Sequence, residues 1–145
     1  MVDTNALVSS FPGTGPPRQI LHRIRDGQDL LCLSAPILTE YLAVLRRGGV
    51  SDALLLSLLD LLCDPERVLV VKPRIRAALI HDDPQDNMFL ECALAATAGL
   101  IISGDRHPRN IAAFRGIPIL SPREYLRLYH NLRLNSRARL GLLHP

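Results

Sequence analysis

Short apolar runs that alternate with helical segments are the feature that most constrains the fold of this chain. Four such runs occur, at residues 30–33, 68–71, 100–103 and 117–120. Strands this short and this apolar are typical of a parallel sheet that is buried on both faces. Crossover helices join strands of that kind. The pattern therefore predicts an α/β fold, a three-layer sandwich with helices on both faces of a central parallel sheet.

The segments between these runs carry helix signals. Apolar spacing, capping residues, N-terminal prolines and terminal glycines mark them. The leucine-rich segment 51–63 is apolar on most of its surface, so we expect that helix to be well buried. Residues 1–5 are expected to form a strand, and the pattern at 73–81 fits either a loop or a short helix. The remaining expected helices cover 18–25, 34–47, 86–98, 106–114 and 121–129.

Length and charge divide the chain unequally. Its 145 residues suit one domain, which we place at 1–128, followed by an Arg-rich tail at 129–145. Residues 122–145 hold five arginines and one acid, whereas the preceding residues are nearly balanced. No apolar run is long enough to span a bilayer and no secretory leader is visible, so we expect a cytoplasmic protein. Three widely spaced cysteines among apolar residues indicate buried side chains, not disulfides or a zinc site.

Four carboxylates are expected at one edge of the sheet. Asp3 and Asp105 follow predicted strands, and Asp86 begins the helix that leads into the strand at 100–103. Glu40 lies about one turn into the helix that follows the strand at 30–33. Ligands of open α/β sheets bind beyond the carboxyl ends of the strands. Each acid taken alone is explained as well by helix capping, a turn or a solvated surface, but capping does not predict that all four converge.

Carboxylates gathered in this way repel one another by about 4 kcal/mol per close pair at an effective dielectric near 20. A divalent cation removes that cost, and ligation by oxygen alone selects Mg²⁺ or Mn²⁺. Such a site activates water and stabilises a leaving oxygen in phosphoryl transfer. The residues themselves therefore favour metal-dependent phosphodiester chemistry.

Four motifs in this order resemble the PIN-domain family. They are MVDTN, SAPILTEYLAVL, DPQDNMFLECALAATAGLIISGD and GIPILSPREYL, and together they cover residues 1 to about 128. The chain is most similar to the stand-alone prokaryotic branch, which includes VapC-type toxin ribonucleases of toxin–antitoxin pairs. The resemblance implies a parallel sheet of about five strands and a metal-dependent nuclease.

The resemblance also implies roles for particular residues. The family's acidic set falls on Asp3, Glu40, Asp86 and Asp105, which would be the catalytic residues and the ligands of Mg²⁺ or Mn²⁺. Asn5 and Ser103 match its small polar positions beside the site. Many relatives carry a further acid where this chain has His107, for which a surface or packing role is the simpler interpretation. The family's first strand is also longer, so we expect the first strand here to be clipped.

Three functions compete at this point. The first is a ribonuclease, whose RNA would be held by Arg106, Arg109, Arg115 and the tail arginines. It would be the toxin of a toxin–antitoxin pair, with an antitoxin protein and a second copy as possible partners. The second is a catalytically weak PIN-like module that binds a protein partner or RNA, in which the leucine-rich segment would serve a dimer or a partner groove. The third, an aspartyl-phosphate phosphatase, needs an acid where Asn5 stands and is disfavoured.

Overall fold

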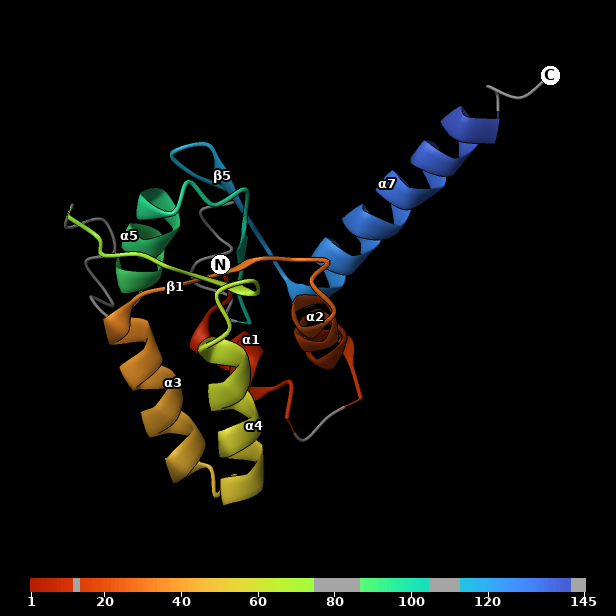
Figure 1. Cartoon of the computed structure of the whole chain (residues 1–145). Coiled ribbons are helices and arrows are strands. Elements are labelled where there is room, and N and C mark those ends of the chain that lie inside the picture. Colours follow the sequence, from red (N-terminus) through yellow and green to blue (C-terminus); the bar gives the residue numbers. More distant parts are fainter. Residues whose placement is uncertain (12–13, 75–86, 105–112, 142–145) are drawn as a thin grey trace.

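Figure 1 shows the computed structural model of the chain, which describes residues 1–11, 14–74, 87–104 and 113–141, with the backbone alone at 133–141. Helices α3 and α4 lie together below the strands in this view, α5 lies above them, and α2 packs against the start of α7. In chain order the elements are α1 (Thr4–Val8), α2 (Pro16–Arg25), β1 (Leu31–Leu33), α3 (Ala35–Arg47), α4 (Asp52–Leu62), β2 (Val68–Val70), α5 (Asn87–Ala95), β3 (Ile101–Ile102), β4 (Ala113–Phe114), β5 (Ile117–Leu120) and α7 (Pro122–Gly141).

Most of the expected elements are present. The four apolar runs contain β1, β2, β3 and β5, and the expected helices at 34–47 and 51–63 match α3 and α4 to within a residue. Residue 86, where the helix at 86–98 was expected to start, lies outside the described residues. The same holds for most of the segment 73–81, for which both a loop and a short helix were considered. The α/β class predicted from strand and helix alternation is confirmed.

The described strands do not form one parallel sheet of five. β1 pairs in parallel with β2, while β5 lies between β3, to which it is parallel, and β4, to which it is antiparallel. The N-terminal segment adds a single parallel bridge, from Val2 to Ile102. The Val2 carbonyl accepts a hydrogen bond from the hydroxyl of Tyr41, so it does not extend a ladder toward β1.

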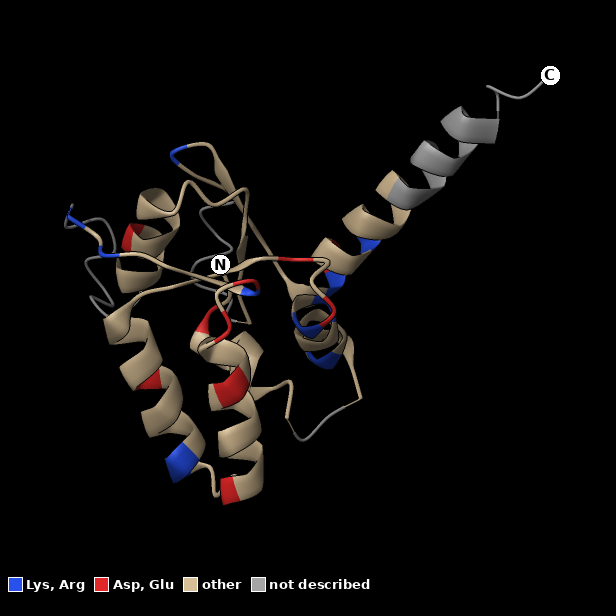
Figure 2. Ribbon diagram, in the orientation of Figure 1, with Lys and Arg blue, Asp and Glu red and all other residues tan. Residues whose placement is uncertain are grey.

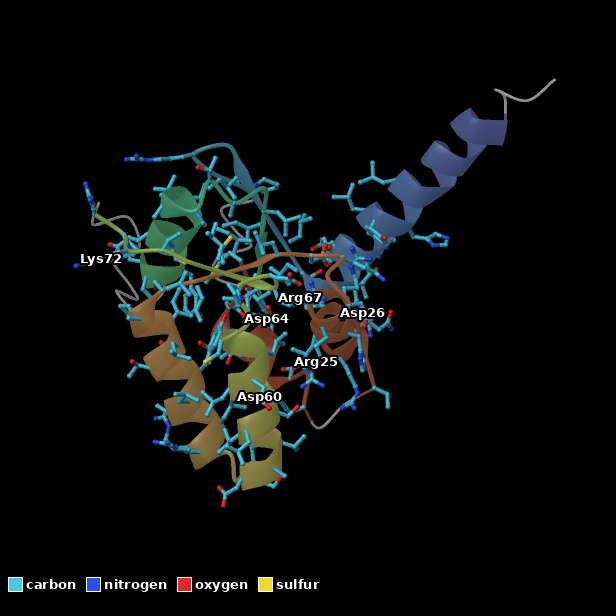
Figure 3. All side chains as sticks on the ribbon, in the orientation of Figure 1. Arg25, Asp26, Asp60, Asp64, Arg67 and Lys72 are labelled. Atoms are coloured by element: carbon cyan, nitrogen blue, oxygen red, sulfur yellow. The ribbon has the colours of Figure 1, made fainter. Side chains whose placement is uncertain are left out.

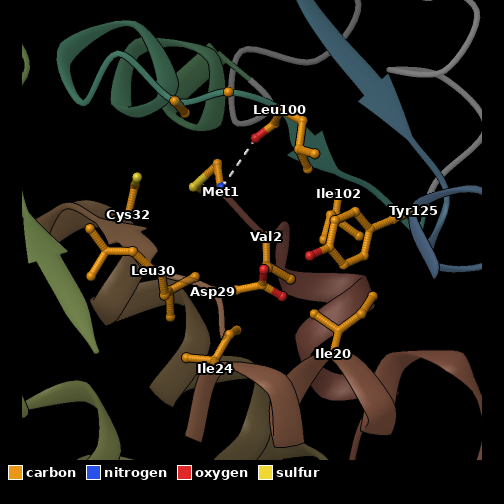
Figure 4. Close-up of a pocket in the computed structure, with 13 residues that line it drawn as sticks. Met1, Val2, Ile20, Ile24, Asp29, Leu30, Cys32, Leu100, Ile102 and Tyr125 are labelled. Atoms are coloured by element: carbon orange, nitrogen blue, oxygen red, sulfur yellow. Dashed lines mark hydrogen bonds between the residues drawn. The ribbon is translucent and has the colours of Figure 1, made fainter. Parts of the chain in front are cut away.

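A cavity of about 140 Å³ lies between the Val2 segment and β1 (Figure 4). Its lining is mostly apolar and includes Met1, Ile20, Leu30 and Leu100, with the carboxylate of Asp29 and the ring of Tyr125 at its wall. The cavity separates the two sheets where a continuous sheet was expected.

The expected strand at 1–5 is replaced by a bridge and a helix. Asp3 is extended, and its side chain accepts a hydrogen bond from the Ala6 amide at 2.7 Å, which caps α1 and starts that helix at Thr4. Local capping by an aspartate thus ends the extended segment two residues earlier than its sequence suggested.

The C-terminal part of the expected helix at 106–114 is also wrong. Ala113 and Phe114 form β4, and Arg115 and Gly116 turn the chain into β5 with φ of 46° and 84°. Two consecutive residues with positive φ match the twist of a β-hairpin, so the glycine that suggested a helix end belongs to a hairpin turn.

Burial differs from the expectation at two places. Leu58, Leu61 and Leu62 of α4 are buried, but Leu54 and Leu56 are 43% and 61% exposed. Two of the cysteines are buried as predicted, and burial raises the pKa of the Cys92 thiol to about 11, whereas Cys63 is exposed. No described helix combines the length and the apolar character needed to cross a bilayer.

The last helix is longer than expected. Ser121 and Glu124 form the predicted capping box, in which the Ser121 amide donates to the Glu124 carboxylate at 2.7 Å and the Glu124 amide to the Ser121 hydroxyl at 3.3 Å. The helix that they start continues to Gly141 and leads away from the body of the molecule (Figure 1).

Candidate active site

Among the described carboxylates at the ends of the strands, Asp3 is held by backbone hydrogen bonds. It directly follows Val2, which bridges to β3, and it is only 6% exposed. Its Oδ1 accepts from the Ala6 amide at 2.7 Å, and the Gly104 amide donates to Oδ1 and Oδ2 at 3.2 and 3.0 Å. Backbone donors of this kind stabilise an ionised carboxylate and hold its position.

Gly104 approaches the start of α1 closely. A Cβ at this position would lie 3.0 Å from the Ala6 nitrogen and 3.2 Å from the carbonyl carbon and Cβ of Asn5. Any side chain here would therefore push the end of β3 away from α1 and from the carboxylate of Asp3.

Glu40 reaches the same place from α3. Its Oε1 accepts a hydrogen bond of 2.6 Å from the hydroxyl of Thr4, the residue that follows Asp3. Glu40 is thus hydrogen-bonded to the residue next to Asp3, although the two acids are separated by 37 positions in the sequence.

Tyr41 lies beside Glu40 in the sequence and is fully buried. Its hydroxyl donates to the Val2 carbonyl, which ties α3 to the segment that carries Asp3. Burial, followed by the nearby carboxylate of Asp3, raises the pKa of Tyr41 well above its ordinary value, so the phenol stays neutral.

The other predicted site residues are placed differently. Ser103 is fully buried between β3 and Gly104, and its amide donates to the Leu120 carbonyl at 2.9 Å; Asn5 lies on the exposed side of α1. Arg115 lies at the hairpin turn, five residues before the end of β5, which places it about 15 Å along the strand from the edge that holds Asp3. Asp86, Asp105, Arg106 and Arg109 lie outside the described residues.

The donor set suits a hard cation. Asp3 and Glu40 supply carboxylate oxygens, and Thr4 supplies a hydroxyl. Among the residues that the structure describes, no three His, Cys, Asp or Glu side chains form a group that could hold a metal ion. The described part of the candidate centre therefore consists of two carboxylates.

Three residues that hold this site were not recognised from the sequence. Thr4 joins the two acids, Gly104 binds Asp3 through its amide, and Tyr41 anchors the first segment. The Asp-Thr pair after a strand and the Ser-Gly-Asp run after another were signals for the first two, whereas Tyr41 reads as an ordinary core position.

Comparisons with known proteins give one result. The family model described as a PIN domain matches residues 1–107. Neither the comparison with curated proteins nor that with solved structures gives a match.

Proposed function

Because the chain belongs to the PIN-domain family, whose members are in general nucleases, we propose that it is a metal-dependent ribonuclease. The observation that carries this proposal is the link from Asp3 through Thr4 to Glu40 at the carboxyl ends of the strands. The family match supports the nuclease class, and the two acids at this edge support a site for a divalent cation.

We assign the metal ligands and catalytic acids to Asp3, Glu40, Asp86 and Asp105, with Mg²⁺ or Mn²⁺ as the ion. When bound, the ion supplies activation of a water molecule and stabilisation of the leaving oxygen in phosphodiester hydrolysis. The backbone amides on Asp3 and the Thr4 hydroxyl on Glu40 orient these two carboxylates. Asn5 and Ser103 would support them, and Arg106 and Arg109 would contact RNA phosphates.

Glu40→Gln is the sharpest variant for testing this site. Glutamine retains an oxygen that accepts from Thr4, so the fold is preserved while the charge is lost. Cleavage of mixed RNA with Mg²⁺ or Mn²⁺ should fall by roughly 10²-fold or more, as when groups that support a metal site are removed.

Glu66→Gln is the matched control, because that acid is exposed and forms a loose surface ion pair, with 3.8 Å between its Oε2 and Nη1 of Arg67. Its activity should equal that of the wild type, and thermal unfolding should show both variants folded. Full wild-type cleavage in EDTA, or full activity of Glu40→Gln, would contradict the proposal.

The toxin role makes a separate prediction. Inducing the wild-type chain in a bacterium without its antitoxin should arrest growth, and inducing Glu40→Gln at equal protein levels should not. Equal growth with both proteins would remove the toxin role and leave the nuclease activity to the cleavage assay.

The alternative, a catalytically weak module, is favoured by one observation on α4. Asp52, Leu56 and Asp60 are spaced by four residues and share one exposed, acidic and apolar face. The exposed Leu128 and Leu132 of α7, with the arginines of that helix in the sequence, have the complementary character, so we propose a second copy as the partner of this face.

Sedimentation at increasing concentration tests this pairing. Leu56→Asp should weaken self-association, whereas Ala43→Asp, at an exposed position of α3, should not. A wild-type chain that stays monomeric would exclude the second copy as the partner.

A further inference from the structure

A second cavity, of about 410 Å³, lies away from the two joined carboxylates. The described part of its lining comes from the chain after β2, the outer side of α5 and the hairpin turn between β4 and β5. Its volume falls within the range of small-ligand pockets, roughly 300–1,000 Å³. The described residues that line it are Lys72, Arg74, Glu91, Leu94, Ala95 and Arg115.

The charge of this cavity is positive. Among the described residues that line it, Lys72, Arg74 and Arg115 are cations, Glu91 is an acid, and all three cations are exposed. The ion pairs found among the described residues, Arg23 with Asp29 and Arg67 with Glu66, involve none of these cations. Figure 2 shows basic segments after β2 and at the hairpin turn on the side where α5 lies, and Figure 3 shows Lys72 far from the other labelled charges.

Three cations around an apolar floor are suited to a nucleotide. The guanidinium groups of Arg74 and Arg115 can bind phosphate oxygens with two hydrogen bonds each, and Lys72 contributes a point charge. Leu94 and Ala95 offer apolar surface to a sugar or a base. Residues 1–121 taken together are nearly neutral, so this concentration of positive charge is local.

The cavity also lies within reach of an RNA strand bound at the carboxylates. Helix α5 begins at Asn87, next to the proposed ligand Asp86, and the cavity takes its residues from positions 91, 94 and 95. At a rise of 1.5 Å per residue these positions lie about 6–12 Å along the helix from its start. An RNA strand that follows α5 therefore reaches the cavity within a few nucleotides.

We propose that this cavity binds one nucleotide of the RNA substrate through its phosphate, at a position away from the cleaved bond. The proposal rests on the proposed ribonuclease function and adds a positioning site to it. The site holds longer RNA in one register across α5 and contributes little to RNA too short to span both places.

The test measures RNA binding in a chelator, so that it does not depend on cleavage. Lys72→Gln/Arg115→Gln removes two cations that come from different segments of the lining, and Arg46→Gln/Arg47→Gln removes two exposed cations at the end of α3. The slope of log affinity against log salt is measured for single-stranded RNA of about four and about twelve nucleotides, which spans the usual site sizes.

For the longer RNA the cavity variant should lose about 0.7 from the magnitude of the slope, the amount that corresponds to the single phosphate bound there. The α3 variant should match the wild type, and the short RNA should not distinguish any of the proteins. Arg115→Lys should keep the wild-type slope, because it keeps the charge.

An unchanged slope in the cavity variant would overturn the positioning site, even if wild-type protein cleaves RNA. An equal loss for both RNA lengths would also overturn it, because that result denotes a general charge effect. The expected slope change without cleavage in Mg²⁺ or Mn²⁺ would support the RNA site and contradict the ribonuclease proposal.

Discussion

At the scale of single residues, the candidate site depends on contacts that leave no room for a side chain. Gly104 donates its amide to Asp3 and touches the backbone of Asn5 and Ala6. The sequence predicted the acids at this edge because their position follows from strand and helix alternation. It did not predict Thr4 or Gly104 as supports, since their roles arise only when two distant segments meet.

Gly104→Ala should destabilise the fold by about 2–3 kcal/mol, because the added methyl overpacks a contact and weakens a hydrogen bond to a carboxylate. The melting temperature should fall by roughly 5–10 °C. Gly99→Ala is the control, since nothing lies within 4 Å of a Cβ there. Equal melting temperatures for the two variants would contradict this prediction, because they would show that β3 moves away from α1 at little cost in stability.

Because Tyr41 is buried, we expect the protein to lose stability at alkaline pH. Its pKa is raised in the folded state, so its contribution is full below the ordinary tyrosine pKa of about 10 and declines as pH rises above it. Burial also raises the pKa of Tyr125, to about 12, which adds to the same trend.

Ultraviolet absorbance of tyrosinate, followed together with unfolding, checks this prediction. Tyr41→Phe should lack the Tyr41 part of the pH dependence and cost about 1–3 kcal/mol at neutral pH, because the Val2 carbonyl loses its partner. Free titration of all three tyrosines near pH 10 in the folded protein would contradict the buried state of Tyr41.

At the scale of elements, the contact between α2 and α7 is held by one buried arginine. Arg23 donates two hydrogen bonds to Asp29, at 2.7 and 2.9 Å, and its guanidinium lies 3.3 Å from the centre of the Tyr129 ring. The charged partner raises the pKa of Arg23 further above its ordinary value, despite the opposing effect of burial. This cluster fixes the first turns of α7 to the body.

Arg23→Lys should destabilise the protein by about 2 kcal/mol, since lysine retains the charge but neither the forked contact nor the stacking. The cost stays below the 3–5 kcal/mol of a fully buried pair because Asp29 is 25% exposed. Chemical denaturation measures it. Arg25→Lys, which changes an exposed contact with Ser57, should stay within about 0.5 kcal/mol of the wild type.

Elements with strong local signals were predicted well, and those decided by pairing were not. The Ser121–Glu124 capping box gave the start of α7, but its end at Gly141 has no comparable signal. The turn at Arg115 and Gly116 was taken for a helix end because glycine serves both purposes. Only the pairing of β4 with β5 distinguishes them.

At the scale of the whole molecule, charge is concentrated on the helix that extends from the body. Residues 122–145 carry five arginines and one acid, in a chain whose total net charge is +3. Long-range attraction to RNA should therefore come largely from α7, in addition to the cavity beside α5.

Replacing Arg133, Arg137 and Arg139 by alanine should reduce the salt slope of RNA binding by about two, at roughly 0.7 per contact. The cleavage rate at saturating RNA should not change. Binding isotherms at several salt concentrations measure the slope, and an identical slope in the variant would mean that these arginines do not contact RNA.

The two duties of Asp3 have a consequence for the design of inactive controls. One carboxylate both caps α1 and joins the candidate metal centre, so an Asp3 variant changes folding and chemistry together. In a growth assay, cells that survive expression of such a variant contain either a folded but inactive protein or a protein that has failed to fold. Growth alone does not distinguish these two cases. Glu40→Gln, whose contact with Thr4 survives the exchange, separates abundance from activity.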